Sequence, residues 1–552
     1  MTLSPPAEPP SPQVPTSRAR RYRQNGWWRH ESVGRLVLGD TDARAGEVAL
    51  VDADGSLTYR ELVTAVERAA GRLRLLGVRA GQPVIVALPN CTELVVLVLA
   101  LIRLGSPPVL SVPSLRFHEL DHVLTATEAV AIATPRRLRR FDHLELADSL
   151  RQRHPSVRFL LVRGDGGAGE VDLTRLCDGA VHPEDPADML VDLPEPAPSD
   201  IAVLLLSSGT TGPPKAIPRR HEGYGYMLRV GMELARLGPD SVYLAAMPAT
   251  HGFVLGCPGI LGTLAAGGRV VLDEAAQDPA RALALIRQQG VTHCAVVPAL
   301  AKQWIAAARS AGEDVPRLEV LQVGGARMHE TDAVAAEQAL GCRVQQVYGM
   351  SEGLLNFTRL DDPDEVRFDT QGRPASPGDE LLVVGEDGRP VRPGERGELL
   401  TRGPYTIPGY YRDPVANAKS FTPEGFYRTG DLVRLLPSGN LVVDGRVHDV
   451  INRGGEKISV EELECLLAED PSIAAAAVVA MPHHVLGETV CLFAVPAGDT
   501  LELRDVRAYL DRCGVAKFKL PEHLEIVDSL PMKGIGKIDR VTLRSRITEQ
   551  RP

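Results

Sequence analysis

One segment of the chain has the composition of a phosphate-binding loop. It spans residues 207–215, directly follows the apolar run 202–206, and contributes Ser207, Ser208, Gly209, Thr210, Thr211, Gly212 and Lys215. Hydroxyl groups and glycine amides can converge on phosphate oxygens, because a glycine-rich turn brings backbone donors close to an anion. The spacing GxxxxGK(S/T) of a P-loop is absent, which disfavours a mononucleotide kinase fold. The segment predicts a flexible anion cradle, with an ordinary surface turn as the alternative.

Two carboxylates lie in turns where they could serve a bound nucleotide. Glu352 ends the segment 348–352 (YGMSE), and Asp431 ends the segment 426–431 (FYRTGD), fifteen residues before Arg446. A carboxylate beside a phosphate-binding loop can hold Mg²⁺, which shields a triphosphate from an attacking carboxylate. An aspartate can accept both ribose hydroxyls, and an arginine can donate to the ribose or to a phosphate. Together they predict a nucleotide site, although each alone would also suit a solvated carboxylate or a structural salt bridge.

Two glycine-flanked turns near the C-terminus carry lysines. Residues 451–458 (INRGGEKI) contain Lys457, and residues 534–537 (GIGK) end in Lys537. A lysine on such a turn can swing its charge into a site built by another domain, where it would bridge a carboxylate nucleophile and the α-phosphate. We expect Lys537 to supply this charge; a solvated lysine is the alternative.

Composition narrows the class of protein. The net charge of -10 and the pI near 5.8 disfavour nucleic-acid binding, which needs clustered Lys and Arg. Eight cysteines form no CxxC pair and follow no secretory signal, which favours reduced thiols in the cytoplasm. The apolar stretch 94–102 is well short of the roughly 20 residues that a bilayer requires, so we expect no membrane partner.

The pattern of apolar residues predicts a large α/β unit. Thr58 and Glu61 have capping-box spacing, and apolar residues then recur at helical intervals until Gly77. Strand-like and helix-like segments alternate afterwards, which implies a largely parallel sheet; the segments are 84–88, 94–104, 107–112, 202–206, 269–272, 279–289 and 295–297.

Two changes in the sequence pattern divide the rest of the chain. Short β-like segments separated by Gly and Pro begin near residue 399 and predict a small β-rich subdomain. Beyond residue 458 the order of helix, two strands, helix and strand predicts a small α+β domain. We therefore expect a disordered Pro- and Ser-rich tail at 1–20, a large N-terminal domain at 21–446, a short connection at 447–449 and a C-terminal domain at 450–552.

Six motifs in this order resemble the adenylate-forming superfamily of acyl-CoA synthetases, peptide-synthetase adenylation domains and luciferases. The motifs are SSGTTGPPK, YGMSE, YRTGD, GR at 445–446, INRGGEKI and GIGK, and they extend over most of the chain. The resemblance implies an acyl-adenylate synthetase-like fold whose mobile C-terminal domain serves two half-reactions in two orientations. It implies that Lys537 acts in the first, that His448 is the hinge, and that a thiol channel is formed by Asn452, Gly454, Gly455 and Lys457.

Within that superfamily the chain is most similar to stand-alone aryl-acid:AMP ligases, such as 2,3-dihydroxybenzoate:AMP ligase. The similarity is carried by RYRQNGWW at 21–28, QQVYGMSEG at 345–353, NFTRLDD at 356–362, TQGRP at 370–374 and RGPY at 402–405. It implies catalytic roles for Lys537, His251, Thr210 and Glu352, the last as the Mg²⁺ ligand. It further implies that ATP or AMP contacts the loop 207–215 together with Gly325, Ala326, Gln346, Val347, Tyr348, Gly349, Met350, Asp431, Val443, Arg446 and Lys537.

The same resemblance places an acid pocket around His251, Gly252, Phe253, Cys257, Gly324, Gly325, Val347 and Gly349. Gly252 departs from the family, which has Asn there to hydrogen-bond a hydroxyl ortho to the substrate carboxylate. A buried hydroxyl without a partner costs on the order of 1–3 kcal/mol. We therefore expect a larger or differently substituted ring, such as an aminohydroxybenzoate or a bicyclic heteroaromatic acid. The alternative is that Gly252 only relieves local packing.

These expectations combine into one predicted reaction. An aryl acid is activated by ATP and Mg²⁺ to acyl-AMP and is then transferred to the phosphopantetheine thiol of an aryl or peptidyl carrier protein, in siderophore or non-ribosomal peptide biosynthesis. An aryl- or fatty-acyl-CoA ligase is the nearest alternative. A nucleotide-binding regulatory protein without turnover is the alternative from another class.

Overall fold

The computed structural model describes residues 11–39, 41–164, 167, 169–182, 185, 193–207, 214–311, 318–446, 450–498, 500–533 and 537–549. The predicted cradle residues Ser208 to Gly212 and the predicted hinge residue His448 lie outside this part of the chain.

The helix α3 (Tyr59–Leu76) forms as its sequence predicts. Thr58 and Glu61 make a reciprocal capping box, with the Glu61 amide donating to Thr58 Oγ1 at 3.3 Å and the Thr58 amide donating to Glu61 Oε2 at 2.8 Å. Gly77 ends the helix with φ +99°, a left-handed conformation that favours glycine. Its buried face includes Leu62 and Leu73, each contributing about 1.5–3 kcal/mol by burial.

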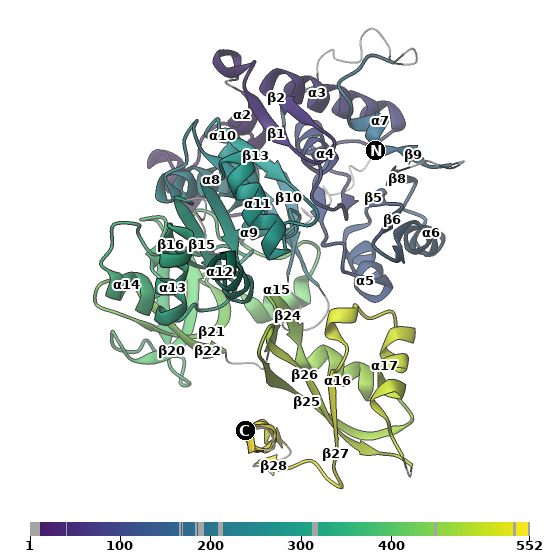
Figure 1. Ribbon diagram of the computed structural model, residues 1–552, viewed down its shortest axis with the longest axis vertical. Coiled ribbons are helices and arrows are strands. Elements are labelled where there is room, and N and C mark those ends of the chain that lie inside the picture. Colours follow the sequence, from purple (N-terminus) through teal and green to yellow (C-terminus); the bar gives the residue numbers. More distant parts are fainter. Residues whose placement is uncertain are drawn as a thin grey trace, which may run out of the picture.

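Two sheets organise the N-terminal domain (Figure 1). The first has nine strands in the order β18 (Arg373–Pro374), β17 (Leu355–Phe357), β16 (Arg343–Gly349), β15 (Val320–Gly324), β14 (His293–Val296), β12 (Val242–Ala245), β13 (Arg269–Leu272), β1 (Val48–Val51) and β2 (Ser56–Thr58). The second has seven in the order β11 (Ala216–Arg220), β10 (Ile201–Leu206), β4 (Pro108–Leu110), β3 (Val84–Val86), β5 (Ala131–Pro135), β8 (Phe159–Arg163) and β9 (Val171–Asp172). The inner strands of both are parallel, which confirms the predicted α/β class.

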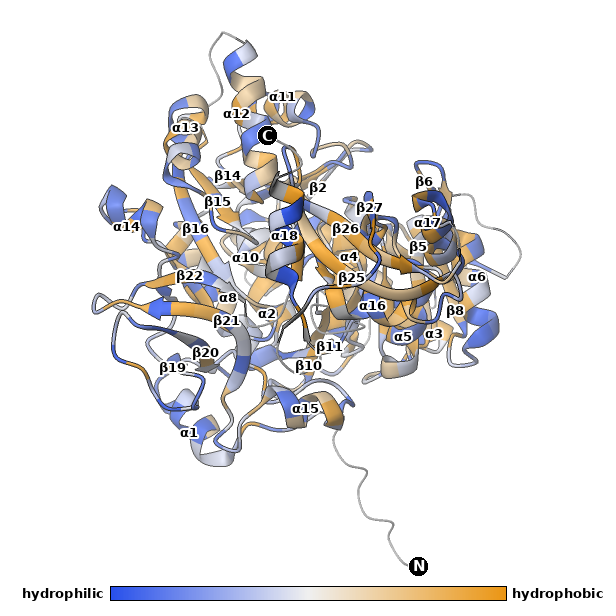
Figure 2. Cartoon of the chain, turned by 90° about the horizontal axis from the view of Figure 1, so that it is seen from below, coloured by the Kyte–Doolittle hydropathy of each residue, from blue (hydrophilic) through white to orange (hydrophobic). Residues whose placement is uncertain are grey.

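Helices cover both sheets. The helix α4 (Thr92–Leu104) is apolar on nearly every side and buries ten residues, as expected of a helix enclosed by other elements. The remaining helices of these layers are α2 (Val33–Leu38), α5 (Phe117–Thr127), α6 (His143–Arg153), α7 (Leu173–Cys177), α8 (His221–Ala235), α9 (Gly252–Gly256), α10 (Gly259–Ala265), α11 (Pro279–Gln289), α12 (Pro298–Ala311), α13 (Glu330–Leu340) and α14 (Asp364–Asp369). Figure 2 shows the alternation of layers, with largely orange strands inside and blue on outer helices such as α14.

The predicted β-rich subdomain is a four-stranded antiparallel sheet. Its strands are β19 (Glu380–Val384), β20 (Arg396–Arg402), β21 (Tyr427–Leu435) and β22 (Leu441–Arg446), and α15 (Pro414–Ser420) precedes β21. A small core of its own lies around Leu354, Val383, Leu399, Val433 and Leu441. Its last strand ends at Arg446, directly before the predicted hinge.

The C-terminal domain has the predicted α+β pattern. Its sheet contains β24 (Glu456–Ser459), β23 (Val450–Arg453), β26 (Gly487–Pro496), β25 (Ile473–His483) and β27 (His523–Ile526), and its helices are α16 (Val460–Leu467), α17 (Leu503–Arg512) and α18 (Arg540–Glu549). A separate hairpin pairs β28 (Met532–Lys533) with β29 (Lys537–Ile538). Separate hydrophobic clusters on the two faces of the sheet stabilise the domain.

The predicted tail is too long. The helix α1 (Thr16–Gln24) already begins within it, and Ser11 is 2% exposed and accepts from Arg220 Nη2 at 2.8 Å. Aromatic contacts anchor this segment, since the Tyr22 ring packs edge-on against Trp28 at 5.0 Å between centroids. The expectation of disorder is therefore wrong for residues 11–20, because aromatic residues further along supply the burial that the Pro-rich sequence lacks.

Two further observations concern the cysteines and the lengths of the helices. All eight cysteines are thiols, and only Cys465 is exposed. No helix in the described part of the chain is long and apolar enough to cross a membrane.

Candidate active site

A cavity of about 450 Å³ lies where the two sheets of the N-terminal domain meet the C-terminal domain. The carboxyl ends of three parallel strands open into it: β14 through Val297, β15 through Gly324 and β16 through Gly349. The end of β10 contributes Leu205 and Ser207 from the other sheet. Ligands of open α/β sheets bind at this position, because the loops after parallel strands converge there.

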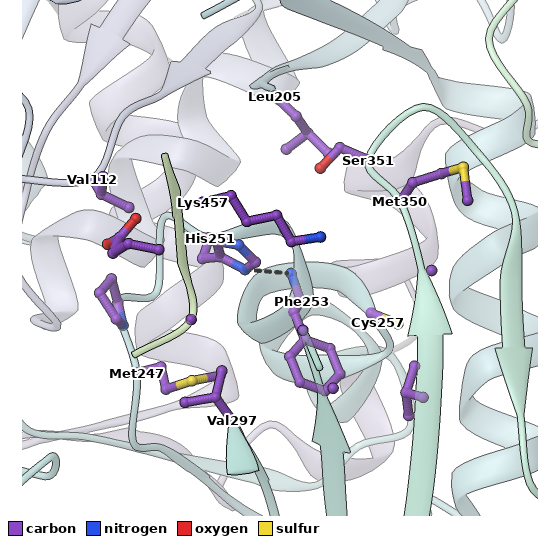
Figure 3. Close-up of a pocket in the computed structure, with 18 of the residues that line it drawn as sticks. Val112, Leu205, Met247, His251, Phe253, Cys257, Val297, Met350, Ser351 and Lys457 are labelled. Carbon is purple, nitrogen blue, oxygen red and sulfur yellow. Dashed lines mark hydrogen bonds between the residues drawn. The ribbon is translucent and has the colours of Figure 1, made fainter. Parts of the chain in front are cut away.

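All eight residues of the predicted acid pocket line this cavity. Figure 3 shows the Phe253 ring standing among them. Gly324 is required beside that ring, because a Cβ there would lie 2.9 Å from Phe253 Cζ and 3.1 Å from the Val347 carbonyl oxygen. Gly349 has no room for a side chain either, since a Cβ would lie 2.4 Å from Leu355 Cδ2. The Phe253 ring therefore packs on Gly324 and Leu355 packs on Gly349, and the Phe253 ring presents an aromatic surface to the cavity.

Gly252 faces an apolar wall of the cavity. A Cβ at this position would lie 3.2 Å from Leu205 Cδ1 and 3.8 Å from Ser351 Oγ, so Leu205 occupies space that a side chain at residue 252 would need. Cys257 lines the same cavity as a buried thiol, and its burial raises its pKa to about 12. The wall offers hydrocarbon, the Ser351 hydroxyl and a neutral thiol, but no carboxamide.

His251 begins the short helix α9. Its Nδ1 accepts from the Phe253 amide at 3.2 Å, the dashed contact in Figure 3. Its ring faces the cavity. The surrounding protein and, to a smaller extent, the charge of Lys457 together lower its pKa to about 4. His251 is therefore a neutral imidazole at physiological pH.

Asn90 fixes the chain that leads to His251. Its Nδ2 donates to the carbonyls of Ala245 at 2.8 Å and Met247 at 2.9 Å, and its Oδ1 accepts from the Ala249 amide at 2.8 Å. Since Met247 and His251 both line the cavity, this buried amide holds one wall of the acid pocket in place.

The buried side chain of Arg219 supports the turn before Glu352. Its Nη1 donates to the Ser351 carbonyl at 2.6 Å and its Nη2 to Met227 Sδ at 3.1 Å. Burial lowers the pKa of this guanidinium, with Tyr224 and Glu352 among the groups that oppose the shift. Arg219 reaches the cavity surface and adds positive charge beside the predicted metal ligand.

Glu352 lies on the cavity, where a magnesium ion bound to a triphosphate would need a ligand. Its side chain is 7% exposed, and its Oε1 accepts from the Tyr410 hydroxyl at 2.9 Å. Mg²⁺ at such sites commonly takes one or two carboxylates and completes its shell with phosphate oxygens and water. Glu352 could supply one such carboxylate, and its role as the Mg²⁺ ligand stays a prediction.

Asp431 also lines the cavity. The Tyr348 hydroxyl donates to its Oδ2 at 2.6 Å, and across the β21–β22 ladder it stands opposite Arg446. This arrangement places an acceptor where a ribose could meet it, and the role of Asp431 in ribose binding stays a prediction.

Of the other residues predicted to bind the nucleotide, some line the cavity and some do not. Val347, Gly349, Met350, Gly325 and Ser207 line it, whereas Gln346 does not. Gln346 belongs to the scaffold: its Nε2 donates to the carbonyls of Arg367 and Phe368 at 3.0 Å, and its Oε1 accepts from the Met328 amide at 3.2 Å. The other predicted residues outside the cavity lining, among those whose side chains the structure describes, are Lys215, Ala326, Tyr348 and Val443.

The C-terminal domain closes the cavity with the β23–β24 hairpin. Gly454, Gly455 and Lys457 line the cavity, and Asn452 Nδ2 donates to the Gly325 carbonyl at 3.1 Å. Gly455 has φ +94°, and a Cβ there would lie 2.7 Å from Val297 Cγ1. Figure 3 shows the Lys457 side chain extended across the mouth of the acid pocket. The residues predicted for the thiol channel are therefore brought together here.

Lys537 is not brought to the cavity. It begins β29, and the β28–β29 hairpin lies at the far end of the C-terminal domain in Figure 1. The domain would have to turn for Lys537 to approach Glu352 and Asp431. The predicted division between two orientations is consistent with this placement, and the catalytic role of Lys537 stays a prediction.

Sequence reasoning missed several lining residues. Val297 follows β14 as Gly325 follows β15, so the rule that sites form at the carboxyl ends of parallel strands could have found it. Arg219, Met227, Met247 and Leu486 carry no such signal, because only the packing of distant segments brings them to the cavity.

The fold and this cavity together define an adenylate-forming acid:AMP or acid:CoA ligase. Residues 40–411 match the model of the AMP-binding enzyme family, and residues 462–537 match that of the AMP-binding enzyme C-terminal domain. The chain belongs to the AMP-binding enzyme family.

Relatives of known activity extend over almost the whole chain. A salicylyl-CoA synthase / salicylate adenylyltransferase from a Streptomyces species is 49% identical over 535 residues, 96% of each chain. A 2-hydroxy-7-methoxy-5-methyl-1-naphthoate–CoA ligase from Streptomyces carzinostaticus is 45% identical over 536 residues, again 96% of each chain. Among solved structures, MbtA from Mycobacterium smegmatis is 42% identical with a TM-score of 0.74, covering 97% of this chain and 98% of that chain.

Proposed function

We propose that this ligase activates an aromatic carboxylic acid as its acyl-adenylate and transfers the acyl group to a phosphopantetheine thiol on an aryl or peptidyl carrier protein. The observation that carries the proposal is the single cavity that holds the aromatic ring of Phe253 together with Glu352 and Asp431. A planar ring would stack on Phe253, and its carboxylate would point to the nucleotide.

In the first half-reaction a substrate carboxylate oxygen bonds to the α-phosphorus of ATP, and the bond from that phosphorus to the bridging oxygen breaks. Pyrophosphate leaves with that oxygen. The loop containing Thr210 and Thr211 binds the triphosphate, and Lys537 stabilises charge on the α-phosphate after the C-terminal domain turns. Mg²⁺, when held by Glu352, supplies charge neutralisation.

In the second half-reaction the thiol sulfur bonds to the acyl carbon, and the bond from that carbon to the phosphate oxygen of AMP breaks. The thiol proton is released, and AMP leaves. The thiol would approach past Gly454, Gly455 and Lys457, which line the cavity. It would also pass Asn452, which donates to the Gly325 carbonyl.

The substrate ring is larger than salicylate or differently substituted from it. The apolar wall around Gly252 and Leu205 offers no carboxamide to an ortho hydroxyl, and burial of that hydroxyl without a partner costs on the order of 1–3 kcal/mol. The naphthoate ligase among the relatives supports a bicyclic acid. We infer an aminohydroxybenzoate or a bicyclic heteroaromatic acid.

Exchange of pyrophosphate into ATP, measured over a panel of aryl acids, tests this proposal. We expect bicyclic or amino-substituted acids to give a higher kcat/KM than salicylate or 2,3-dihydroxybenzoate. The paired variant Gly252→Asn with Leu205→Ala should raise the relative use of salicylate about ten-fold. Leu205→Ala makes room for the new side chain at residue 252, whose carboxamide then becomes the hydrogen-bond partner of the ortho hydroxyl. Leu205→Ala alone is the matched control. A large preference of the unaltered protein for salicylate would contradict the proposed acid.

Transfer to free CoA is the second candidate, because the salicylyl-CoA synthase and the naphthoate–CoA ligase among the relatives carry CoA in their names. Offering CoA and a holo carrier protein side by side at equal concentration separates the two. A higher kcat/KM with the carrier protein is the expected result. A higher value with CoA would replace the carrier in this proposal and leave the adenylation step unchanged.

A further inference from the structure

The C-terminal domain contacts the N-terminal domain at the start of α5 as well as over the cavity. The His118 amide donates to the Gly514 carbonyl at 3.1 Å, and Glu119 Oε1 accepts from the Ala516 amide at 3.1 Å. Gly514 packs tightly here, because a Cβ would lie 3.1 Å from Phe117 Cβ. These contacts join α5 to the connection between α17 and β27.

Glu119 also belongs to a buried ionic cluster that spans the two domains. Lys519 Nζ lies 3.0 Å from Glu119 Oε1 and 2.7 Å from Glu462 Oε1, and the three side chains are at most 3% exposed. Glu462 and Lys519 come from the C-terminal domain, whereas Glu119 comes from the N-terminal domain. His118 Nε2 lies 3.5 Å from Glu462 Oε1 at the edge of the cluster.

The charges of this cluster depend on one another because water is excluded from them. Burial alone would lower the pKa of Lys519, but Glu119 and Glu462 outweigh burial and raise it, so the lysine stays charged. Glu119 Oε2 accepts from the Arg116 amide at 3.0 Å, which leaves Lys519 as its cationic partner in the cluster. Removing one member of a buried pair leaves an uncompensated charge, which disfavours the arrangement strongly.

The cluster distinguishes one orientation of the C-terminal domain from any other. If the domain turns, Lys519 keeps Glu462, which travels with it, whereas Glu119 stays behind and becomes hydrated. The contact between Glu119 and Lys519 therefore adds free energy only to the orientation seen here. A contact present in one state and absent from the other shifts the balance between them by its own free energy.

We propose that Glu119 is a positioning residue for acyl transfer: through Lys519 it holds the C-terminal domain in the orientation that places Gly455 and Lys457 over the cavity. The inference rests on the proposed two-step function, in which this orientation serves the second half-reaction. Glu119 is not among the residues that line the cavity, so it acts through the position of the domain.

The variant Glu119→Gln tests this role by removing the charge with little change in shape. Two rates are measured: pyrophosphate exchange, and thioester formation from supplied acyl-adenylate. We expect kcat/KM for thioester formation to fall at least about ten-fold, while exchange stays unchanged or becomes faster. The matched control is Glu128→Gln at the end of the same helix, where an exposed carboxylate pairs with Arg412 within the N-terminal domain. Both rates should stay unchanged in that control.

The outcomes separate the positioning role from a failure to fold and from a failure of the proposed function. Retained exchange shows that the variant is folded, so a selective loss of transfer supports the role, and equal loss or no loss of both overturns it. Hydrogen exchange at the Ala516 amide needs no substrate: faster exchange in Glu119→Gln than in Glu128→Gln supports the contact, and equal exchange overturns it. If no acid supports exchange with the unaltered protein, the proposed function fails, while the hydrogen-exchange comparison still decides the role of Glu119.

Discussion

Two hairpins of the C-terminal domain carry the lysines that the sequence marks for chemistry, and they lie in very different places. The β23–β24 hairpin brings Lys457 into the cavity, with Gly455 against Val297. The β28–β29 hairpin holds Lys537 at the far end of the domain (Figure 1). One rigid domain cannot offer both lysines to the same acyl group at once. On the proposed function, the orientation seen here serves only one of the two half-reactions, the transfer to a thiol.

The substitution Lys537→Ala is expected to have the largest effect and tests whether the two hairpins serve different half-reactions. We expect pyrophosphate exchange to fall at least about 100-fold, because the α-phosphate loses a charge that is fixed during its reaction. Thioester formation from supplied acyl-adenylate should change less than about two-fold, because that step does not require β29 at the cavity. Lys517→Ala, on the exposed surface of the same domain, is the control and should alter neither rate. Equal loss of both rates in Lys537→Ala would contradict the division between the hairpins.

The opposite selectivity is expected from Gly455→Ala. The added Cβ would meet Val297 Cγ1 at 2.7 Å, so the β23–β24 hairpin could no longer seat over the cavity. We expect thioester formation to fall about ten-fold or more and exchange to be retained. Gly487→Ala is a matched control, because Gly487 also has a positive φ, +79°, but its nearest neighbour to a Cβ would be 3.9 Å away. Equal effects of the two variants would mean that backbone strain, not contact with Val297, is responsible.

The smallest expected effect concerns the charge of His251, and it tests whether Lys457 lies close enough to lower the pKa of that ring. The surrounding protein and, to a smaller extent, Lys457 lower the pKa of His251 to about 4, so the ring stays neutral as the pH falls from 8 to 5.5. The ring resonances, assigned with His251→Gln, should therefore show no titration over that range. In Lys457→Met the pKa should rise toward its ordinary value, because one cationic neighbour is lost. A midpoint near 6.5 in the unaltered protein would contradict the lowered pKa of His251.

Local sequence signals predicted most of the fold. The helix α3 follows from Thr58, Glu61 and Gly77, which specify its ends without help from distant residues. The strand β13 and the helix α11 have the bounds that apolar patterning indicates. The start of the chain was predicted wrongly, because the burial of Tyr22 depends on an aromatic contact with Trp28 that no local pattern shows.

The acid pocket was predicted as a set of residues, but its shape was not. Resemblance named Gly252, while only the coordinates show that Leu205 fills the neighbouring space. The sequence does not mark Arg219 and Asn90 as site residues, because they act through hydrogen bonds to carbonyls far along the chain. The orientation of the C-terminal domain is likewise invisible in sequence, since the same residues must serve two arrangements.

The pattern of cysteine burial gives this protein a built-in site for a reporter group. Cys465 on α16 is exposed, whereas six of the other thiols are buried and Cys513 is partly covered. A maleimide dye would therefore attach first to the C-terminal domain, on the same helix that carries Glu462. Fluorescence anisotropy or energy transfer from that position could follow the turning of the domain during catalysis without any engineered cysteine.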